Sequence, residues 1–295
     1  MSSGINRVIS LVDDYRAGQQ AGGHVAMFHT GRVGSTVVAK LLEQHPQIHW
    51  DGELFERRLQ RRRGKLRSKR RDLLPPLVDL RMRVGHAARA GRIYGFEAKH
   101  QTDQHGYVYG LEIGPFVDWL MRHGVDRFIE VRRENYLRQV VSTIRLRQTG
   151  RSHARIDQQV EHPPIVIDPE AVPLGRTQVS LLERFAIFDE LHQATRRALQ
   201  GQQALQLTYE RDIERNPVAA YQRICAFLDL EPAPAEVRLR RTNDAPLTDL
   251  IANFDEVAER LVATPYSWML EGEALPAAMQ SSHNMGQSAG PASLS

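Results

Sequence analysis

Short apolar runs alternate with longer amphipathic stretches along most of this chain, a pattern typical of strands that alternate with helices. Strands are expected over residues 24–28, 47–50, 92–99, 127–131 and 204–208. Helices are expected over residues 35–44, 135–148, 179–199 and 218–228. Because strands joined through helices form βαβ units, the pattern predicts an α/β domain with an open, mainly parallel sheet flanked by helices.

The length of the chain, 295 residues, and its apolar content of 41% are enough for one sizeable core. We expect a single domain over residues 24–270, preceded by an N-terminal extension over 1–23. Residues 162–173, HPPIVIDPEAVP, are expected to form an irregular connection. Residues 271–295 lack periodic apolar positions and are expected to be disordered.

No apolar run approaches the roughly 18 residues that a membrane span needs. The N-terminus, MSSGINRVISLVDDYR, lacks the charged start and apolar stretch of a signal peptide. These features favour a cytoplasmic protein without a transmembrane segment. Cys225 is the single cysteine and lies at an apolar helical spacing, so we expect a thiol in the core.

The positive charge of the chain is concentrated in residues 57–71, RRLQRRRGKLRSKRR, where ten of fifteen residues are Lys or Arg. Such a run can be a solvated helix face or a mobile loop. It can also be a field that gathers an anionic cosubstrate or acceptor. Nucleic-acid binding is a third interpretation, although no RNA-binding aromatic motif or zinc-finger spacing accompanies the charge.

The segment GRVGST joins the first expected strand to the first expected helix. Backbone N–H groups converge on an anion where a glycine-bearing turn leads into a helix N-terminus. Gly31 and Gly34 permit backbone conformations closed to other residues, and Arg32 adds a permanently charged, forked donor. Ser35 and Thr36 are expected to cap the helix and to donate hydroxyls to the same anion. The alternative is a capped turn in an unrelated α/β protein.

This segment differs from the ATP-binding Walker A loop, which reads GxxxxGK[ST]. No lysine precedes Ser35, and no first glycine stands at the required spacing. ATP with magnesium is therefore not favoured as the ligand.

Three further segments carry candidate site residues. Arg133 follows a strand, and Ser142 comes nine positions later on a helix, so the two could bind a second phosphate. Glu53, in WDGELF, follows the second expected strand. Tyr209, in LTYERDIERNP, stands at a strand end, where its ring could flank a base.

Together these motifs resemble the sulfotransferases that use 3'-phosphoadenosine 5'-phosphosulfate (PAPS). GRVGST resembles the 5'-phosphosulfate loop of that family, and Arg133 with Ser142 resembles its 3'-phosphate motif. YERDIERNP is similar to the segment with a YEDL start and a later proline, and HPQIHWDGELF is similar to the bacterial carbohydrate sulfotransferases that modify lipo-oligosaccharides. The resemblance covers about residues 24–270 and implies a P-loop-like sulfotransferase fold.

The resemblance implies in-line transfer of a sulfuryl group from PAPS to an acceptor hydroxyl, which releases 3'-phosphoadenosine 5'-phosphate (PAP). Arg32 and the loop N–H groups would stabilise charge on the leaving oxygen. Glu53 would be the general base, in a partly desolvated cleft that raises a carboxyl pKa toward neutrality. No metal is required by this scheme. The acceptor is expected to be a small molecule or glycan, with a carbohydrate hydroxyl favoured by GELF.

Two departures from the family pattern affect the assignments. Val33 stands where the loop usually has serine or threonine, which removes one hydroxyl contact. Arg132 and Arg133 are adjacent, so either could bind the 3'-phosphate; Arg133 is the first choice.

Other residues are weaker candidates for the site. Glu56, His100 and His105 are alternatives to Glu53 as the base. Lys99 ends a strand, at the edge where ligands bind in open α/β sheets. Two late arginines that could close over a nucleotide are Arg240 and Arg241.

A metal site at His45 and His49 is not expected, because Pro46 breaks the helix that would place both rings on one face. Two other classes of protein stay open as alternatives to a sulfotransferase. One is a P-loop nucleotide kinase or NTPase, which would need magnesium ligands. The other is a basic nucleic-acid-binding protein that acts through residues 57–71, with an affinity that falls steeply with salt.

Overall fold

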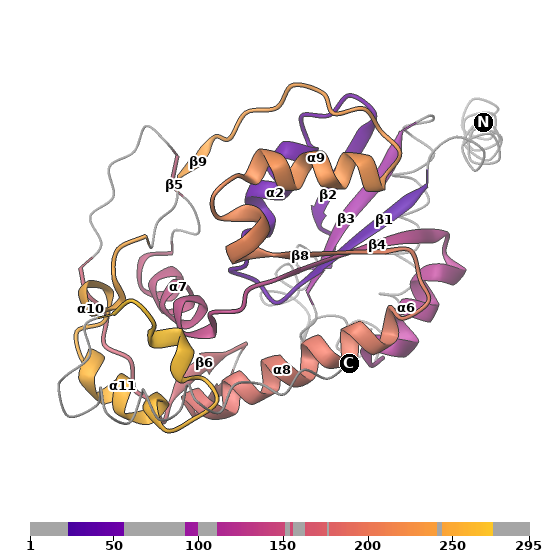
Figure 1. Ribbon diagram of the computed structural model, residues 1–295. Coiled ribbons are helices and arrows are strands. Elements are labelled where there is room, and N and C mark those ends of the chain that lie inside the picture. Colours follow the sequence, from indigo (N-terminus) through magenta and orange to yellow (C-terminus); the bar gives the residue numbers. More distant parts are fainter. Residues whose placement is uncertain are drawn as a thin grey trace, which may run out of the picture. The chain divides into compact units, whose positions relative to one another are not determined.

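The computed structural model describes residues 23–55, 92–99, 111–150, 154–155, 163–175, 177–240 and 244–273 (Figure 1). The chain divides into two compact units. The first unit draws on Met1–Glu134 and Glu190–Val237, and the second on Asn135–Asp189 and Arg238–Ser295. The predicted domain limits at residues 24 and 270 stay predictions. The basic run at 57–71 and nearly all of the predicted tail lie outside the described residues.

The first unit contains a five-stranded sheet whose strands are all parallel. Its strands are β1 (His24–His29), β2 (Ile48–Glu53), β3 (Ile93–Lys99), β4 (Val125–Arg132) and β8 (Ala204–Thr208). They lie in the order β2-β3-β1-β4-β8 (Figure 1). The predicted α/β class with an open, parallel sheet is therefore confirmed, and all five expected strands are present.

The order of the strands reverses beside β1. The chain goes from β1 to β2 and β3 on one side, and it later places β4 on the other side. In open α/β sheets, ligands bind outside the carboxyl ends of the strands at such a switch point. The loop that follows His29 leaves the sheet at this position.

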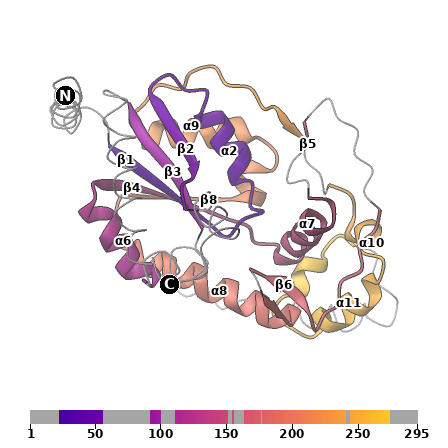
Figure 2. The same cartoon turned by 180° about the vertical axis from the view of Figure 1, so that it is seen from behind.

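Helices cover both faces of the sheet in the first unit. On one face lie α2 (Ser35–Leu42) and α9 (Pro217–Phe227), and on the other lies α6 (Ile113–Arg122) (Figure 2). Successive residues of β1 point to opposite faces, so Val25 and Met27 join the α2 and α9 core, while Phe28 joins the α6 core. Burial on both faces explains why β1 is apolar almost throughout.

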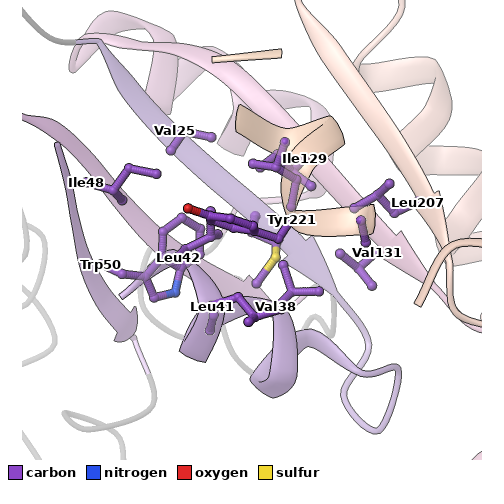
Figure 3. Close-up of a cluster of buried hydrophobic side chains, with 14 of the residues drawn as sticks. Val25, Val38, Leu41, Leu42, Ile48, Trp50, Ile129, Val131, Leu207 and Tyr221 are labelled. Carbon is purple, nitrogen blue, oxygen red and sulfur yellow. The ribbon is translucent and has the colours of Figure 1, made fainter. Parts of the chain in front are cut away.

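The core under α2 and α9 is drawn in Figure 3, with Val38, Leu41 and Leu42 packed toward strand residues such as Val25 and Ile129. Cys225 is fully buried in this cluster, as predicted, and burial raises the pKa of its thiol. A π-helical turn, η2 (Tyr209–Ile213), joins β8 to the segment before α9. π-helical turns are rare in proteins, and those that occur are often found at functional sites.

The second unit consists of helices and two short antiparallel pairs of strands. Its helices are α7 (Tyr136–Thr149), α10 (Leu247–Leu250), α11 (Phe254–Val262) and the 3-10 turn η3 (Ser267–Leu270). Its strand pairs are β5 (Ala154–Arg155) with β9 (Leu239–Arg240), and β6 (Val172–Leu174) with β7 (Thr177–Val179). The helix α8 (Leu181–Ala198) begins in this unit and ends in the first.

The side chains of Asn135 and Asp189 stabilise local structure in the second unit. The Asn135 side chain accepts a hydrogen bond from the Arg138 amide and so caps α7. Asp189 accepts hydrogen bonds from the hydroxyls of Tyr136 and Tyr266, at 2.8 and 2.7 Å. The connection over 162–173 was expected to be irregular; the structure places most of β6 in it, paired with β7.

No helix among the residues described here is both long and apolar enough to cross a lipid bilayer.

Candidate functional site at the carboxyl edge of the sheet

The loop between β1 and α2 has an unusual backbone. Gly31 and Gly34 both have φ +83°, and Arg32 between them has φ +57°. The left-handed region costs a non-glycine residue roughly 1–2 kcal/mol. Residues held there are over-determined by their surroundings and cluster at binding sites. The backbone conformation of the loop GRVGST is therefore one that its surroundings must hold in place.

The start of α2 differs from the predicted capping arrangement. Gly34 is the N-cap, and no side chain among the described residues caps the helix through a hydrogen bond. Ser35 is the first helical residue, and its hydroxyl lies 3.4 Å from His29 Nδ1. Thr36 follows in the first turn. The prediction that these two residues cap α2 is wrong, because the turn places both inside the helix.

Gly34 and Val33 fix the loop against the core. A Cβ at Gly34 would lie 2.8 Å from Tyr209 Cδ2 and 3.1 Å from Ile213 Cγ2. Val33 is fully buried in the core under α2 and α9. Val33 is thus an apolar anchor of the loop.

Gly34→Ala is expected to lower the free energy of unfolding by about 2–4 kcal/mol, because it combines backbone strain at φ +83° with overpacking against Tyr209. The matched control is Gly201→Ala, which has φ +80° and nothing within 4 Å of the added Cβ. Urea unfolding of both variants measures the difference. Equal destabilisation would show that the contact with Tyr209 contributes nothing.

Two arginines lie close together at the loop: Arg32 is part of it, and Arg133 contacts its backbone. Arg133, which is 7% exposed, donates from Nη1 to the Arg32 carbonyl at 3.4 Å. Burial first, and then the positive charge of Arg133, lower the pKa of the Arg32 guanidinium, while the charge of Glu53 acts in the opposite direction. Two guanidinium groups that disfavour each other's charge form a place where an anion is stabilised.

The adjacent arginines of the β4 end have different surroundings. Arg133 Nε lies 3.6 Å from Glu210 Oε1, and its Cζ lies 4.5 Å from the centre of the Tyr209 ring. Arg132 instead contacts Glu134 Oε1 at 3.3 Å and Thr208 Oγ1 at 3.4 Å. Arg133 also donates to the Arg32 carbonyl of the loop, whereas the contacts given for Arg132 go to Glu134 and Thr208, so Arg133 is the better candidate for binding a ligand at the loop.

Tyr209 directly follows the end of β8, as predicted, and its ring lies between Arg133 and the loop. The ring is partly buried, with the Arg133 guanidinium over it and the loop at Gly34 against its edge. A ring covered in this way supports Arg133 and the loop. The interpretation that it flanks a base stays a prediction that this geometry does not favour.

Glu53 ends β2 and is opposite Glu97 in the register of the sheet. Its Oε2 lies 2.8 Å from Lys99 Nζ, and the two side chains are 34% and 20% exposed. Lys99 also lies beside the loop, since its Cε is 3.8 Å from a Cβ built on Gly31.

A buried pair, His29 and Glu97, lies beneath this ion pair. His29 Nε2 is 3.2 Å from Glu97 Oε2, and the two residues are 1% and 5% exposed. Trp50 Nε1 donates to Glu97 Oε1 at 3.2 Å. Burial alone would raise the pKa of Glu97, but the contacts with His29 and Trp50 and the charge of Lys99 together lower it. Glu97 is therefore an ionised carboxylate inside the core.

Glu97 makes stability depend on acid pH. Its folded pKa lies below the ordinary value of 4.5, so its contribution is present above that value and is lost as the pH falls through the lowered pKa. Glu97→Gln is expected to lower the free energy of unfolding by about 1–3 kcal/mol at pH 7. Below pH 4.5, the free energy of unfolding of the variant should fall less steeply with pH than that of the unaltered protein. Urea unfolding between pH 7 and 3 measures this, with the exposed Glu43→Gln as control. Parallel curves for Glu97→Gln and the unaltered protein would contradict it.

His29, Glu53 and Glu97 each offer one ligand atom, and these atoms lie within 4.8 Å of one another. Such a set could hold a metal ion. In this structure the atoms have protein partners: Glu53 is paired with Lys99, and Glu97 with His29 and Trp50. His45, by contrast, contacts the Glu231 carbonyl and the Gln47 amide through its two ring nitrogens.

Sequence reasoning missed His29, Glu97 and Glu210. The available signal was position, because His29 and Glu97 lie near the carboxyl ends of adjacent parallel strands, where ligand sites form. The register that brings Lys99 opposite His29 could not be read from the sequence.

Several predicted residues are not brought to this site by the described structure. Ser142 is buried on α7 in the second unit, whereas Arg133 belongs to the first, so their pairing stays a prediction. Arg240 is in β9, also in the second unit. The predicted candidates that lie outside the described residues are Glu56, His100, His105 and Arg241.

No family model matches the chain, and no curated protein matches it. Among solved structures, the chain is similar to a sulfotransferase from Alicyclobacillus acidocaldarius, at 15% identity and a TM-score of 0.44. The similar region covers 85% of this chain and 95% of the other. A similarity at that level supports no conclusion about function, and the case for a function comes from the side chains of the site.

Proposed function

We propose that this protein is a sulfotransferase that moves a sulfuryl group from PAPS to an acceptor hydroxyl and releases PAP. The observation that carries the proposal is the pair of arginines at the β1 loop. Arg133 reaches the loop backbone at Arg32, and its charge helps to lower the pKa of Arg32. A bound anion relieves that repulsion, so the site favours a ligand with several negative charges.

The donor would be bound at two places. The 5'-phosphosulfate would lie at the loop and the α2 N-terminus, where backbone N–H groups and the helix dipole favour an anion. The residues that would bind it are Gly31, Arg32, Gly34, Ser35 and Thr36. Arg133 and Ser142 would bind the 3'-phosphate, with Tyr209 supporting Arg133 from below. Forked donation by arginine suits phosphate oxygens.

The transfer would need a base and a stabilised leaving group. Glu53 would accept the proton of the acceptor hydroxyl as the new oxygen–sulfur bond forms. The bond between sulfur and the 5'-phosphate oxygen would break, and Arg32 would stabilise the charge that develops on that oxygen. Lys99 holds Glu53 in place through their 2.8 Å ion pair. The scheme uses only these side chains and requires no metal.

The acceptor would be a carbohydrate or glycolipid hydroxyl. This part of the proposal depends on the resemblance of GELF to the glycan-modifying bacterial branch. Glu53 of that motif ends β2, and its charge acts on Arg32 of the loop, where an acceptor would have to approach the sulfuryl group.

Calorimetric titration tests the proposal with three ligands: PAP, ATP with magnesium, and a random oligonucleotide, each at two salt concentrations. We expect micromolar binding of PAP without metal, tighter than that of ATP. Preference for ATP with magnesium would indicate a nucleotide kinase or NTPase. Binding of the oligonucleotide alone, falling steeply with salt, would indicate a nucleic-acid binder.

A further inference from the structure

His29 touches both ends of the anion loop with one ring nitrogen. Its Nδ1 accepts a hydrogen bond from the Gly31 amide at 3.1 Å. The Ser35 hydroxyl lies 3.4 Å from the same nitrogen. Because His29 is the last residue of β1 and is 1% exposed, these contacts tie the loop to the sheet from within the core.

The other ring nitrogen faces a buried carboxylate. Since the Gly31 amide can only donate, Nδ1 acts there as the acceptor, and the ring proton belongs on Nε2. Nε2 lies 3.2 Å from the Glu97 carboxylate, an acceptor. Glu97 is held in turn by the Trp50 indole at 3.2 Å. Nδ1 thus accepts a hydrogen bond from the loop, while Nε2 lies at ion-pair distance from a buried carboxylate.

The loop needs such a support because it contains a strained residue. Arg32 has φ +57°, and a left-handed arginine persists only where its surroundings hold it. The contacts of His29 lie immediately before Arg32, at Gly31, and shortly after it, at Ser35. A loop fixed in its binding shape loses less conformational entropy when the ligand arrives.

We propose that His29 is a positioning residue of the donor site, which holds the Gly31 amide and the Ser35 hydroxyl so that the loop is shaped before the anion binds. Glu97, which accepts a hydrogen bond from Trp50, favours the tautomer of His29 that has its proton on Nε2 and leaves Nδ1 as the acceptor. This inference rests on the proposed function, since the anion it concerns is the donor phosphosulfate.

Two substitutions at His29 distinguish the roles of its two ring nitrogens. His29→Asn keeps an amide oxygen close to the position of Nδ1, whereas His29→Gln extends toward the position of Nε2 and leaves Gly31 without its acceptor. Calorimetry with PAP is expected to show affinity within about threefold of the unaltered protein for His29→Asn, and about tenfold weaker for His29→Gln. Thermal unfolding of both variants is measured in parallel.

The matched control is His24→Asn, at the opposite end of β1, where the buried His24 ring contacts the Gly124 carbonyl at 3.0 Å. It should lower thermal stability and leave PAP affinity unchanged. If PAP affinity followed thermal stability across all three variants, or if His29→Gln bound PAP normally, the positioning role would be refuted.

The outcome for the unaltered protein separates this inference from the proposed function. Absence of PAP binding there refutes the proposed function, and the positioning role falls with it. Normal binding there with an unaffected His29→Gln refutes the positioning role alone. If the His29→Gln variant unfolds, the test becomes hydrogen exchange of the Gly31 amide in the unaltered, unliganded protein. Protection of this amide supports the positioning role, and exchange at the rate of an open loop overturns it.

Discussion

Glu53→Gln is expected to lower the rate of sulfuryl transfer about a thousandfold, the middle of the range for loss of a general base. PAP affinity should stay within about twofold of normal, because glutamine has the same size and PAP contains no group that the base deprotonates. The measurement is transfer of labelled sulfuryl from PAPS to an acceptor on which the unaltered protein is active, beside calorimetry with PAP.

The control for this substitution is Glu43→Gln, at the C-cap of α2, where the exposed Glu43 carboxylate pairs only with the neighbouring Lys40 within the described structure. It should change neither transfer nor binding. Full turnover by Glu53→Gln would show that another group is the base, and the candidates would then be Glu56, His100 and His105.

Arg32→Ala and Arg133→Ala are each expected to weaken PAP binding about tenfold to a hundredfold. Hydrogen bonds to charged groups are worth roughly 1.5–3 kcal/mol, and each 1.4 kcal/mol is a factor of ten. Calorimetry measures the loss. Arg132→Ala is the matched control, because Arg132 is held by Glu134 and Thr208. A larger loss for Arg132→Ala than for Arg133→Ala would reverse the assignment of the 3'-phosphate contact.

Ser142→Ala extends this test to the second unit. If Ser142 and Arg133 bind the same phosphate, the double variant should lose less affinity than the sum of the two single losses, as expected for residues that share a partner. Strict additivity would show that Ser142 acts elsewhere, for instance within the packing of α7, where it is buried.

Much of the fold could be predicted because strands and helices leave local patterns. All five sheet strands lie where apolar runs placed them, with ends shifted by up to three residues. The helices α6 and α11 were not predicted, and α6 contains Gly114 and Pro115. In the structure the proline is in the first turn of the helix, where its missing N–H has no partner to lose.

The site could be predicted only where a motif carries the residues. Arg32, Gly34 and Glu53 were named from GRVGST and GELF, and electrostatic coupling now links Arg32 to Glu53. His29 and Glu97 have no motif, because their contact depends on how β1 and β3 lie in register. The position of Tyr209 under Arg133 depends on the π-helical turn η2, which no local pattern indicates.

The most direct test of the central claim is calorimetric titration of the unaltered protein, without metal, with PAP and with adenosine 5'-monophosphate, which lacks the 3'-phosphate. A site with two phosphate contacts predicts micromolar binding of PAP and at least about tenfold weaker binding of the monophosphate, because the charge-assisted contacts of the second phosphate are lost. Equal affinity for the two nucleotides, or no binding of PAP, would contradict the account.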